Sequence, residues 1–269
     1  MEKRILFFDV DGTLFDCANG MSYISNHLKQ ALKQLQAQGH LCFVASGRSY
    51  AYLNQEIREI GFDGFVLCNG AIALKDGKPL ISHYIPRTEV KKLVGEFEKK
   101  GISYCLLDTN TSYCPTKFKA MYEMFKRFEV PLEYFVDDFD LNEVDTAKIE
   151  VLCEKDEDKD YIRALRLEGY EILDYGNSGS FEINLGGISK GKSIVELLHI
   201  LNIPIENSIA FGDGANDMEM IEVVGYGVAM GNGYEALKKI ANHVTEPCVE
   251  HGIVKELQRL GLVNTIISI

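Results

Sequence analysis

Two aspartates, Asp9 and Asp11, stand two residues apart directly after an apolar run at residues 5–8. The run has the composition of a fully buried strand, and Gly12 follows the second carboxylate. Two like charges this close raise each other's pKa unless a positive charge lies between them. A divalent cation is the simplest such charge, and hard oxygen ligands of this kind suit Mg²⁺. The spacing therefore predicts a metal-assisted carboxylate site at the carboxyl end of a buried strand.

Three further polar signals lie at the ends of predicted strands or at the starts of predicted helices. The first is Ser-Gly-Arg at residues 46–48, the second is Lys190 within Ser-Lys-Gly, and the third is Gly-Asp-Gly-Ala-Asn-Asp at residues 212–217. Ligands of open parallel sheets bind outside the carboxyl ends of the strands. We therefore expect all four signals to meet at one site.

Each signal taken singly has an ordinary structural explanation. Asp11 and Asp213 each precede a glycine, as residues of simple turns do, and Ser46 has the side chain of a helix N-cap. Lys190 by itself would be read as a surface lysine, since lysines are mostly exposed. Their order and their equivalent positions on the predicted strands favour a joint function over four coincidences.

The overall composition limits the class of protein. A chain of 269 residues holds one large domain or two ordinary ones. The formal net charge of −12 argues against a broad nucleic-acid-binding face, although a local cation and a lysine can still attract a small anion. No apolar run approaches the roughly 20 residues needed to cross a bilayer, and the first residues do not have the pattern of a secretory signal. We expect no membrane partner.

The seven cysteines form no Cys-x-x-Cys pair, and their number is odd. We therefore expect reduced thiols and a cytoplasmic location. Cys17 lies close to the first motif, but no histidine is arranged to activate it as a nucleophile.

Strands and helices alternate in the first 70 residues and again after residue 190. Strands separated by helices indicate right-handed βαβ units and a parallel sheet. The apolar patterns predict strands at 4–8, 41–45, 65–68, 208–211 and 227–230, and helices at 22–38, 49–60, 190–201, 215–223, 234–241 and 252–260.

The pattern changes between these two regions. Asp76 and Gly77 form a good hairpin turn between apolar stretches at 71–75 and 80–85. Helices at 87–100, 118–127 and 157–168 then alternate with strands at 103–107, 147–153, 170–174 and 180–184, which indicates an α+β unit with an antiparallel sheet. We expect an α/β protein whose Rossmann-like core, residues 1–82 and 185–269, is split by an inserted α+β domain at residues 83–184.

The four motifs resemble those of the haloacid dehalogenase superfamily, and the match to its Cof-type branch is close. The first motif reads Asp-Val-Asp-Gly-Thr-Leu at residues 9–14, and Ser-Gly-Arg, Ser-Lys-Gly and Gly-Asp-Gly-Ala-Asn-Asp follow in the family's order. Cys-Asn-Gly-Ala at 68–71, Gly-Val-Ala-Met-Gly-Asn at 227–232 and Ala-Asn-His-Val-Thr at 241–245 also agree. The resemblance covers both core segments, and the long gap between the second and third motifs resembles a cap domain of the C2B type.

The resemblance implies a Mg²⁺-dependent phosphatase that forms an aspartyl-phosphate. Asp9 would be the nucleophile, and Asp11 would be the general acid and base. The ion would take the side chains of Asp9 and Asp213 and the backbone carbonyl of Asp11. Asp217 would act behind these ligands or through water.

The resemblance also implies which residues hold the phosphoryl group. Ser46, the Gly47 N–H and Asn216 would contact it, and Lys190 would add a positive charge between it and Asp9. Arg48 would either contact phosphate or anchor its loop. Ser49 stands where the family often has proline, which bears on the stiffness of this loop.

The expected substrate is a small phosphorylated metabolite, most of all a sugar phosphate, with flavin mononucleotide and pyridoxal phosphate as alternatives that the family suggests. The inserted cap would close over the site and select the substrate. Phosphoryl transfer to an acceptor other than water, and a non-catalytic regulatory protein that binds a phosphometabolite, are the competing functions. We expect no nucleic-acid partner, and a monomer or a weak homo-oligomer.

Overall fold

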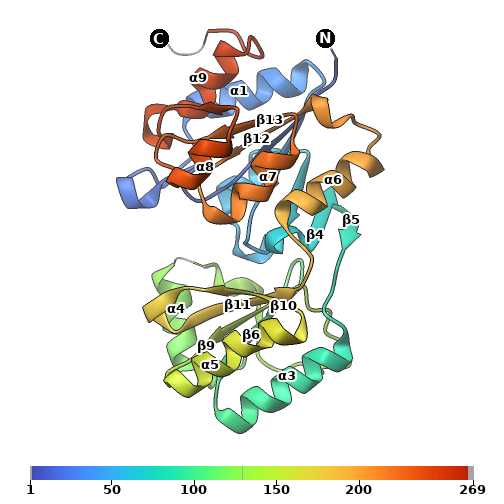
Figure 1. Cartoon of the computed structure of the whole chain (residues 1–269), viewed down its shortest axis with the longest axis vertical. Coiled ribbons are helices and arrows are strands. Elements are labelled where there is room, and N and C mark those ends of the chain that lie inside the picture. Colours follow the sequence, from blue (N-terminus) through green and yellow to red (C-terminus); the bar gives the residue numbers. More distant parts are fainter. Residues whose placement is uncertain (1, 129, 266–269) are drawn as a thin grey trace. The chain divides into compact units, whose positions relative to one another are not determined.

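The computed structural model describes residues 2–128 and 130–265, and the chain forms two compact units (Figure 1). The first unit consists of Met1–Gly47, Gln55–Ile81 and Ser189–Ile269. The second consists of Arg48–Asn54 and Ser82–Ile188. The second unit thus takes in one residue before and four residues after the predicted 83–184 insertion, together with the short segment after the Ser-Gly motif.

In its described residues, the first unit holds an eight-stranded sheet in the order β14-β13-β12-β1-β2-β3-β4-β5. The strands from β14 to β3 pair in parallel, and β4 joins β3 in the antiparallel direction. Helices separate the parallel strands along the chain, so the predicted α/β class with a parallel core sheet is confirmed. The strands are β1 (Ile5–Phe8), β2 (Leu41–Ala45), β3 (Gly64–Leu67), β4 (Ile72–Lys75), β5 (Lys78–Ser82), β12 (Ser208–Gly212), β13 (Tyr226–Ala229) and β14 (His243–Val244).

The central strand β1 is buried on both faces, which explains why its sequence is apolar without alternation. Ile5 and Phe7 belong to a core cluster with residues of α6, α7 and α8. Helix α1 packs against β2 and against α9. The helices of this unit are α1 (Asn26–Ala37), α2 (Gln55–Glu59), α6 (Lys190–Ile200), α7 (Met218–Val223), α8 (Glu235–Ile240) and α9 (Gly252–Arg259).

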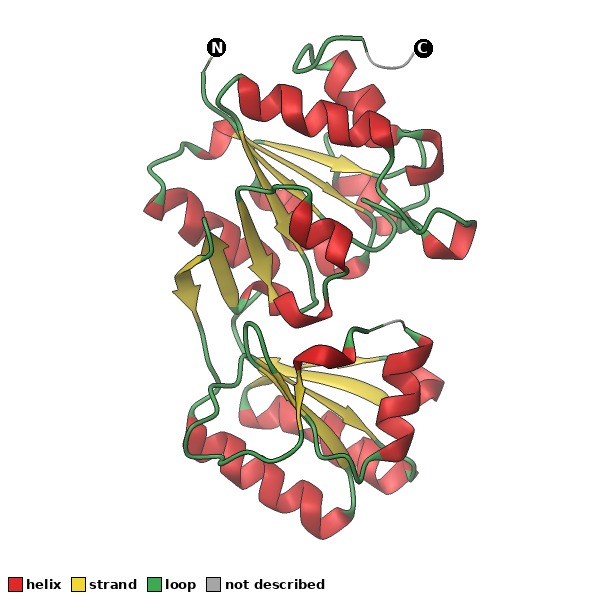
Figure 2. Cartoon of the chain, turned by 180° about the vertical axis from the view of Figure 1, so that it is seen from behind, coloured by secondary structure: helices red, strands yellow, loops and turns green. Residues whose placement is uncertain are grey.

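The second unit, by its described residues, is built on a six-stranded sheet in the order β10-β11-β9-β6-β7-β8. Figure 2 shows the strands of the chain in yellow and its helices in red, seen from behind. Its pairs are antiparallel except for β7 with β8, which are parallel. Residues of α3 and α5 share one core cluster with the sheet, and α4 belongs to another. The elements are α3 (Arg87–Lys100), β6 (Ser103–Leu107), β7 (Ser112–Tyr113), α4 (Lys119–Arg127), β8 (Phe135–Val136), β9 (Lys148–Leu152), α5 (Asp156–Ala164), β10 (Tyr170–Asp174) and β11 (Ser180–Leu185).

The predicted helix at 49–60 is confirmed only in its second half, as α2, because the chain there packs into two different cores. Tyr50–Tyr52 form a single 3₁₀ turn, and Leu53 is extended before α2 begins. Ala51 and Tyr52 pack into the second unit, whereas Ile57 is buried in the first. The helical spacing of apolar residues therefore came from two separate burials rather than from one helix face.

Smaller differences lie at the ends of elements. The predicted helix at 22–38 begins only at Asn26, because Ser25 is its N-cap and accepts a hydrogen bond from the Leu28 N–H. The strands β7, β8 and β14 have two residues each and were not predicted. Strands this short carry too few residues to show an alternating pattern.

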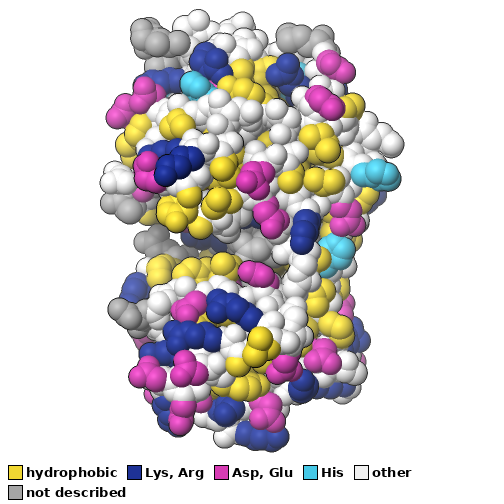
Figure 3. All heavy atoms as spheres, in the orientation of Figure 1, with side chains coloured by type: hydrophobic (Ala, Val, Ile, Leu, Met, Phe, Trp, Pro, Cys, Tyr) yellow, Lys and Arg dark blue, Asp and Glu magenta, His cyan; other side chains and the backbone are white. Residues whose placement is uncertain are grey.

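Charged side chains of both signs are interspersed on the face of each unit shown in Figure 3. In the part of the chain that the structure describes, no helix combines the length and the apolar character needed to cross a membrane.

Candidate functional site

The parallel pairing of β1 with β12 brings the first and last motifs together. Phe8 lies opposite Phe211 in this pair, and the Asp9 N–H donates a hydrogen bond to the Phe211 carbonyl at 3.0 Å. Asp9 and Asp213 each stand directly after the last residue of their strand. Both carboxylates are therefore delivered to the same carboxyl edge of the sheet, as the sequence predicted.

Lys190 is the first residue of α6, and its ammonium group lies between two carboxylates. Its Nζ is 2.6 Å from Asp9 Oδ1 and 2.7 Å from Asp217 Oδ1. The side chain of Ser189 caps the helix by accepting the Lys192 N–H, which fixes the direction in which α6 begins. Lys190 is only 1% exposed, so the reading of it as a surface lysine is wrong.

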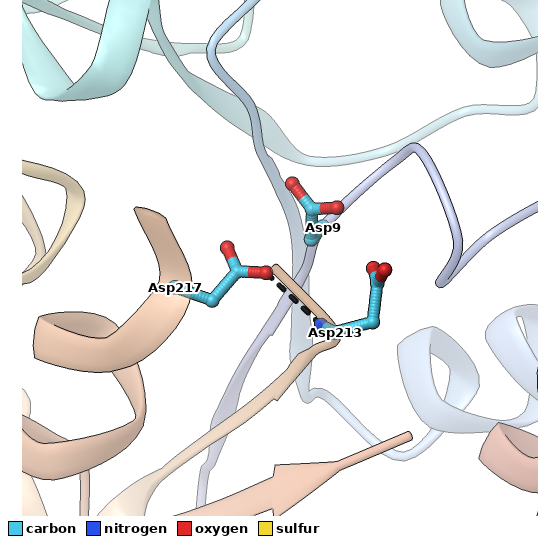
Figure 4. Close-up of side chains that lie close together, drawn as sticks. All are labelled: Asp9, Asp213 and Asp217. Carbon is cyan, nitrogen blue, oxygen red and sulfur yellow. Dashed lines mark hydrogen bonds between the residues drawn. The ribbon is translucent and has the colours of Figure 1, made fainter. Parts of the chain in front are cut away.

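Asp217 uses its second oxygen to shape the loop that carries Asp213. Asp217 Oδ2 accepts the backbone N–H of Asp213 at 3.0 Å and that of Gly214 at 2.9 Å. Figure 4 shows the first of these bonds and the three aspartate side chains gathered around one space. Because both of its oxygens are engaged, fully buried Asp217 positions Lys190 and the loop.

The first motif also supports Asp213 directly. Thr13 Oγ1 donates a hydrogen bond to Asp213 Oδ1 at 2.9 Å. Gly12 has a φ of +89°, and a Cβ atom built on it would lie 2.2 Å from Asp213 Oδ2. Glycine is therefore required at residue 12 both by the backbone conformation and by the closeness of the carboxylate.

Three carboxylates with one lysine give this site an excess of negative charge. One carboxylate oxygen each of Asp9, Asp213 and Asp217 lies within 4.8 Å of the other two. Burial, and next the charge of Asp217, raises the pKa of Asp9 well above its ordinary range. Burial is also the main cause that raises the pKa of Asp213 to about 6. Burial lowers the pKa of Lys190, but the charges of Asp217 and Asp9 outweigh it and keep the ammonium protonated.

These residues fit a divalent cation. The donors are hard carboxylate oxygens, which Mg²⁺ prefers, and burial, with the charge of Asp217 adding to it, raises the pKa values of Asp9 and Asp213. Of the three, Asp217 is already committed to Lys190 and to two backbone N–H groups. Asp9 and Asp213 are therefore the side chains suited to hold the ion.

Asp11 differs from Asp9 in its surroundings. It is exposed, whereas Asp9 is 7% exposed. The backbone after it closes a tight turn in which the Gly12 N–H donates to the Phe15 carbonyl at 2.8 Å. The two carboxylates of the first motif thus stand in different environments, which is what separate chemical roles would require.

The second motif connects to the last one through Asn69. The Asn69 N–H donates to the Ser46 carbonyl at 3.2 Å, and a Cβ built on Gly47 would lie 2.8 Å from Asn69 Oδ1. The same Asn69 oxygen accepts from Asn216 Nδ2 at 3.4 Å. The structure therefore brings Gly47 and Asn216 around one amide, with the buried Ser46 directly before Gly47.

Two other residues near the motifs have a narrower role. Arg48 belongs to the second unit and donates from Nη1 to the Tyr52 carbonyl at 3.1 Å, which anchors its loop. Cys17 is an exposed reduced thiol, and the other six cysteines are buried reduced thiols.

Three supporting residues were not predicted as site residues. They are Thr13, Asn69 and Asn232, and all of them lie within stretches that had matched the family's motifs. Asn232 Nδ2 donates to the Gly12 carbonyl at 2.8 Å, and its Oδ1 accepts the Cys248 N–H at 2.9 Å. Their positions after strands were a usable signal, but their roles depend on loop geometry that spacing alone does not give.

Comparison with known proteins places these observations in a family. The model of the haloacid dehalogenase-like hydrolases matches residues 6–257. The chain is 29% identical over 267 residues to the putative phosphatase YkrA of Bacillus subtilis, covering 98% of this chain and 100% of that protein. It is 24% identical over 262 residues to the 5-amino-6-(5-phospho-D-ribitylamino)uracil phosphatase YcsE of Bacillus subtilis, covering 96% of each. Among solved structures, the subclass IIB sugar phosphatase BT4131 aligns with a TM-score of 0.79 and 27% identity, covering 97% of this chain and all of that one.

Proposed function

The chain belongs to the haloacid dehalogenase-like hydrolase family and is a phosphoric monoester hydrolase, and from this premise we propose that it hydrolyses sugar phosphates with Mg²⁺ through an aspartyl-phosphate. The observation that carries the proposal is the buried group of Asp9, Lys190 and Asp217, with Asp213 beside it. In this group, Lys190 contacts both Asp217 and Asp9, and Asp9 is the candidate nucleophile.

In the first step, an oxygen of Asp9 attacks phosphorus and the bond from phosphorus to the ester oxygen breaks. The leaving alkoxide takes the proton of the Asp11 carboxyl group. Asp11 suits this role because its exposed side chain can exchange protons with water between turnovers. Lys190, 2.6 Å from Asp9, orients the nucleophile and offsets the negative charge of the approaching phosphoryl group.

In the second step, Asp11 is a carboxylate and acts as a base. A water molecule gives its proton to Asp11 while its oxygen attacks phosphorus, and the bond between phosphorus and Asp9 breaks. Inorganic phosphate leaves, Asp9 returns to a carboxylate, and Asp11 is again protonated. One residue thus serves both steps, and no further acid is needed.

Asp9 and Asp213 would hold the cation, with the Asp11 carbonyl as a third ligand. When bound, Mg²⁺ supplies charge that reduces the repulsion between a carboxylate and a phosphate dianion. Thr13 and Asp217 keep the Asp213 carboxylate and its loop in place for this role.

Ser46, the Gly47 N–H and Asn216 would bind the phosphoryl oxygens. Support comes from Asn69, whose contacts hold Gly47 and Asn216 around one amide. Ser46 is buried and directly precedes Gly47 in the chain.

The substrate class rests on the relatives and on the inserted unit. One relative is named for a phosphorylated ribitylamino compound, and one structural neighbour is a sugar phosphatase. Both names describe phosphate esters of hydroxylated carbon chains. We propose the same class for this chain, with the second unit as the part that selects the substrate.

Phosphate release from p-nitrophenyl phosphate and from a set of sugar phosphates tests the proposal. The wild type with Mg²⁺ should release phosphate, and EDTA or Asp9→Asn should abolish the release. Asp138→Asn, an exposed carboxylate in the second unit, is the control and should leave it unchanged. Release that survives both EDTA and Asp9→Asn would overturn the mechanism.

A further inference from the structure

The connection between β3 and β4 has an unusual backbone. Cys68, Asn69 and Gly70 have φ values of +51°, +54° and +101°, so three successive residues lie in the left-handed region. Glycine adopts this region freely, but a side chain raises the free energy of such a backbone at the other two positions. Among the described residues, no other two adjacent non-glycine residues share it. We call residues 68–70 the left-handed turn.

The hairpin itself does not require this conformation. Leu67 lies opposite Ile72 in the β3–β4 pair, so four residues connect the two strands. Connections of this length are most often built around a type I turn, whose central residues have negative φ. Backbone strain persists where the surrounding structure holds it in place, and it clusters at functional sites. The reason for the strained backbone must therefore lie in the contacts around the turn.

One set of contacts ties the left-handed turn to the start of α6. Ser193 is 1% exposed, and its Oγ donates a hydrogen bond to the Gly70 carbonyl. A Cβ built on Gly70 would lie 2.3 Å from the Ser189 carbonyl oxygen, so the two backbones are in close contact. Lys190 follows Ser189 and contacts Asp9. The turn is thus fixed relative to the lysine of the site.

The other set of contacts leads to the residues proposed to bind the phosphoryl group. The Asn69 N–H donates to the Ser46 carbonyl at 3.2 Å, and Asn69 Oδ1 accepts from Asn216 Nδ2 at 3.4 Å. A Cβ built on Gly47 would lie 2.8 Å from the same Oδ1. Asn69 is 9% exposed. The left-handed turn therefore joins the second, third and fourth motifs through one residue and its successor.

We propose that Asn69 is a positioning residue, which sets the distance between the phosphoryl-binding groups of Gly47 and Asn216 and the pair formed by Lys190 and Asp9. This role rests on the proposed function, in which those groups hold the phosphoryl oxygens while Asp9 attacks phosphorus. Asn69 acts through its neighbours and needs no contact with the substrate. Asparagine suits the position because its short side chain tolerates a left-handed backbone and carries an acceptor for Asn216.

Asn69→Gly separates the amide group from the backbone. Glycine adopts the left-handed conformation without strain, so the turn can keep its path while the amide contacts disappear. Asn202→Gly is the matched control, because Asn202 is an exposed asparagine with φ +53° just after α6. Both substitutions remove an amide from a left-handed residue, and only the first lies at the site.

Calorimetric titration with inorganic phosphate in the presence of Mg²⁺ measures binding without turnover, and p-nitrophenyl phosphate kinetics give KM and kcat. We expect Asn69→Gly to bind phosphate about tenfold more weakly and to raise KM by a similar factor. The fall in kcat should be smaller, since contacts to the phosphoryl oxygens exist before the reaction as well as during it. Asn202→Gly should match the wild type in all three quantities.

A double-mutant cycle tests whether Asn69 acts through Asn216. Asn216→Ala should weaken phosphate binding, and Asn69→Gly in that background should weaken it by less than its factor in the wild type, because the two amides form one contact. A purely structural role of Asn69 would give the same factor in both backgrounds.

Ser193→Ala tests the link to α6 and leaves Asn69 unchanged. Loss of the donor to the Gly70 carbonyl should free the start of α6 to shift, and we expect kcat to fall about threefold or more. Ser208→Ala is the control, since Ser208 is also buried and donates from Oγ to the Ile205 carbonyl at the start of β12. Both variants should lose stability, and only Ser193→Ala should lose activity. Where Asn69→Gly does not fold, this pair decides the inference.

The outcomes separate this inference from the proposed function. An active wild type, with Asn69→Gly equal to Asn202→Gly in KM and in phosphate affinity, would overturn the role of Asn69 and leave the proposed function standing. A wild type that binds phosphate but hydrolyses no ester would refute the proposed function, and the phosphate titrations would still decide the role of Asn69. A wild type that neither binds phosphate nor hydrolyses an ester would overturn both.

Discussion

Lys190 Nζ lies 2.6 Å from Asp9 Oδ1, and the two residues are 181 positions apart in the chain. The ammonium group also contacts Asp217 at 2.7 Å, so one buried lysine balances two buried carboxylates. Removing one partner of such a group leaves charge buried without compensation. The lysine therefore supports both the fold of the site and the reactivity of Asp9.

Lys190→Met should lower both kcat and the free energy of unfolding. We expect the free energy of unfolding in EDTA to fall by about 3 kcal/mol, because Asp9 and Asp217 lose their common cation. We expect kcat to fall by about 10²- to 10³-fold, since the charge near the phosphoryl group is lost. Urea unfolding and p-nitrophenyl phosphate kinetics measure the two effects.

Lys192→Met is the control for this change, because Lys192 lies in the same helix turn and its side chain is exposed. Its stability and kcat should match those of the wild type. Equal losses in Lys190→Met and Lys192→Met would show that the buried contacts do not matter.

Gly12→Ala should damage the metal site through a direct clash. The new Cβ would lie 2.2 Å from Asp213 Oδ2, so the carboxylate must move. We expect kcat/KM to fall at least about 100-fold, because the mutation displaces a group that would hold the cation. Gly20→Ala imposes the same kind of backbone strain, with φ +83°, but its Cβ meets nothing within 4 Å.

Gly20→Ala should therefore cost about 1 kcal/mol of stability and leave kcat/KM unchanged. If the two alanine variants lose activity equally, backbone strain rather than the position of Asp213 is responsible.

Asp213→Asn should stabilise the metal-free protein at neutral pH. Burial raises the pKa of Asp213 from 3.8 to about 6, so the folded state binds more protons than the unfolded state between these values. The stability of the wild type in EDTA should then fall as pH rises from about 4 to about 6 and stay low above that range. The variant removes this loss, and we expect it to be more stable by about 2 kcal/mol at pH 7 and equal at pH 4.

Chemical unfolding in EDTA at the two pH values measures this difference, with Asp138→Asn as the exposed control. A gain of the same size at pH 4 and pH 7 would contradict the assignment, because it would not depend on the charge of Asp213.

Mg²⁺ should stabilise the wild type by binding only its folded state. At about 100 times the dissociation constant, the gain is about 2.7 kcal/mol, which corresponds to a rise in melting temperature of about 5–10 °C. Asp9→Asn and Asp213→Asn should lose this rise, since both carboxylates would hold the ion.

Asp11→Asn should keep the rise in melting temperature and still lose about 10²- to 10⁴-fold in kcat, because its carboxyl group would transfer protons and would not bind the metal. Calorimetry with and without Mg²⁺, combined with kinetics, separates the two aspartates. Loss of the metal effect in Asp11→Asn would place its side chain among the ligands.

Local patterns in the sequence were sufficient where one element serves one core. The helix predicted at 87–100 matches α3 at both ends, because Gly101 ends it in a left-handed conformation and its apolar stripe faces a single cluster. The predicted meeting of Asp9, Lys190 and Asp213 follows from the rule that ligands collect at the carboxyl ends of parallel strands. These inferences needed only order and periodicity.

Features that depend on the three-dimensional surroundings could not be predicted. The helix at 49–60 was confirmed only over α2, because its apolar residues belong to two cores. The strands that carry Lys148 and Asn184 were predicted, but an alternating strand does not reveal whether its polar face is covered. The contact from Thr13 to Asp213 depends on how two loops approach each other across 200 positions.

The pairing of β1 with β12 also has a consequence for the order of folding. The second unit is made almost entirely from one continuous stretch, Ser82–Ile188, and this stretch is synthesised before α6 and β12. Domains generally fold as units during synthesis, so this stretch can become compact while β1 still lacks a neighbour on one side. Closing so long a loop is slow, and it comes last. The nascent chain therefore stays inactive until its final third has been synthesised and has delivered Lys190 and Asp213 to Asp9.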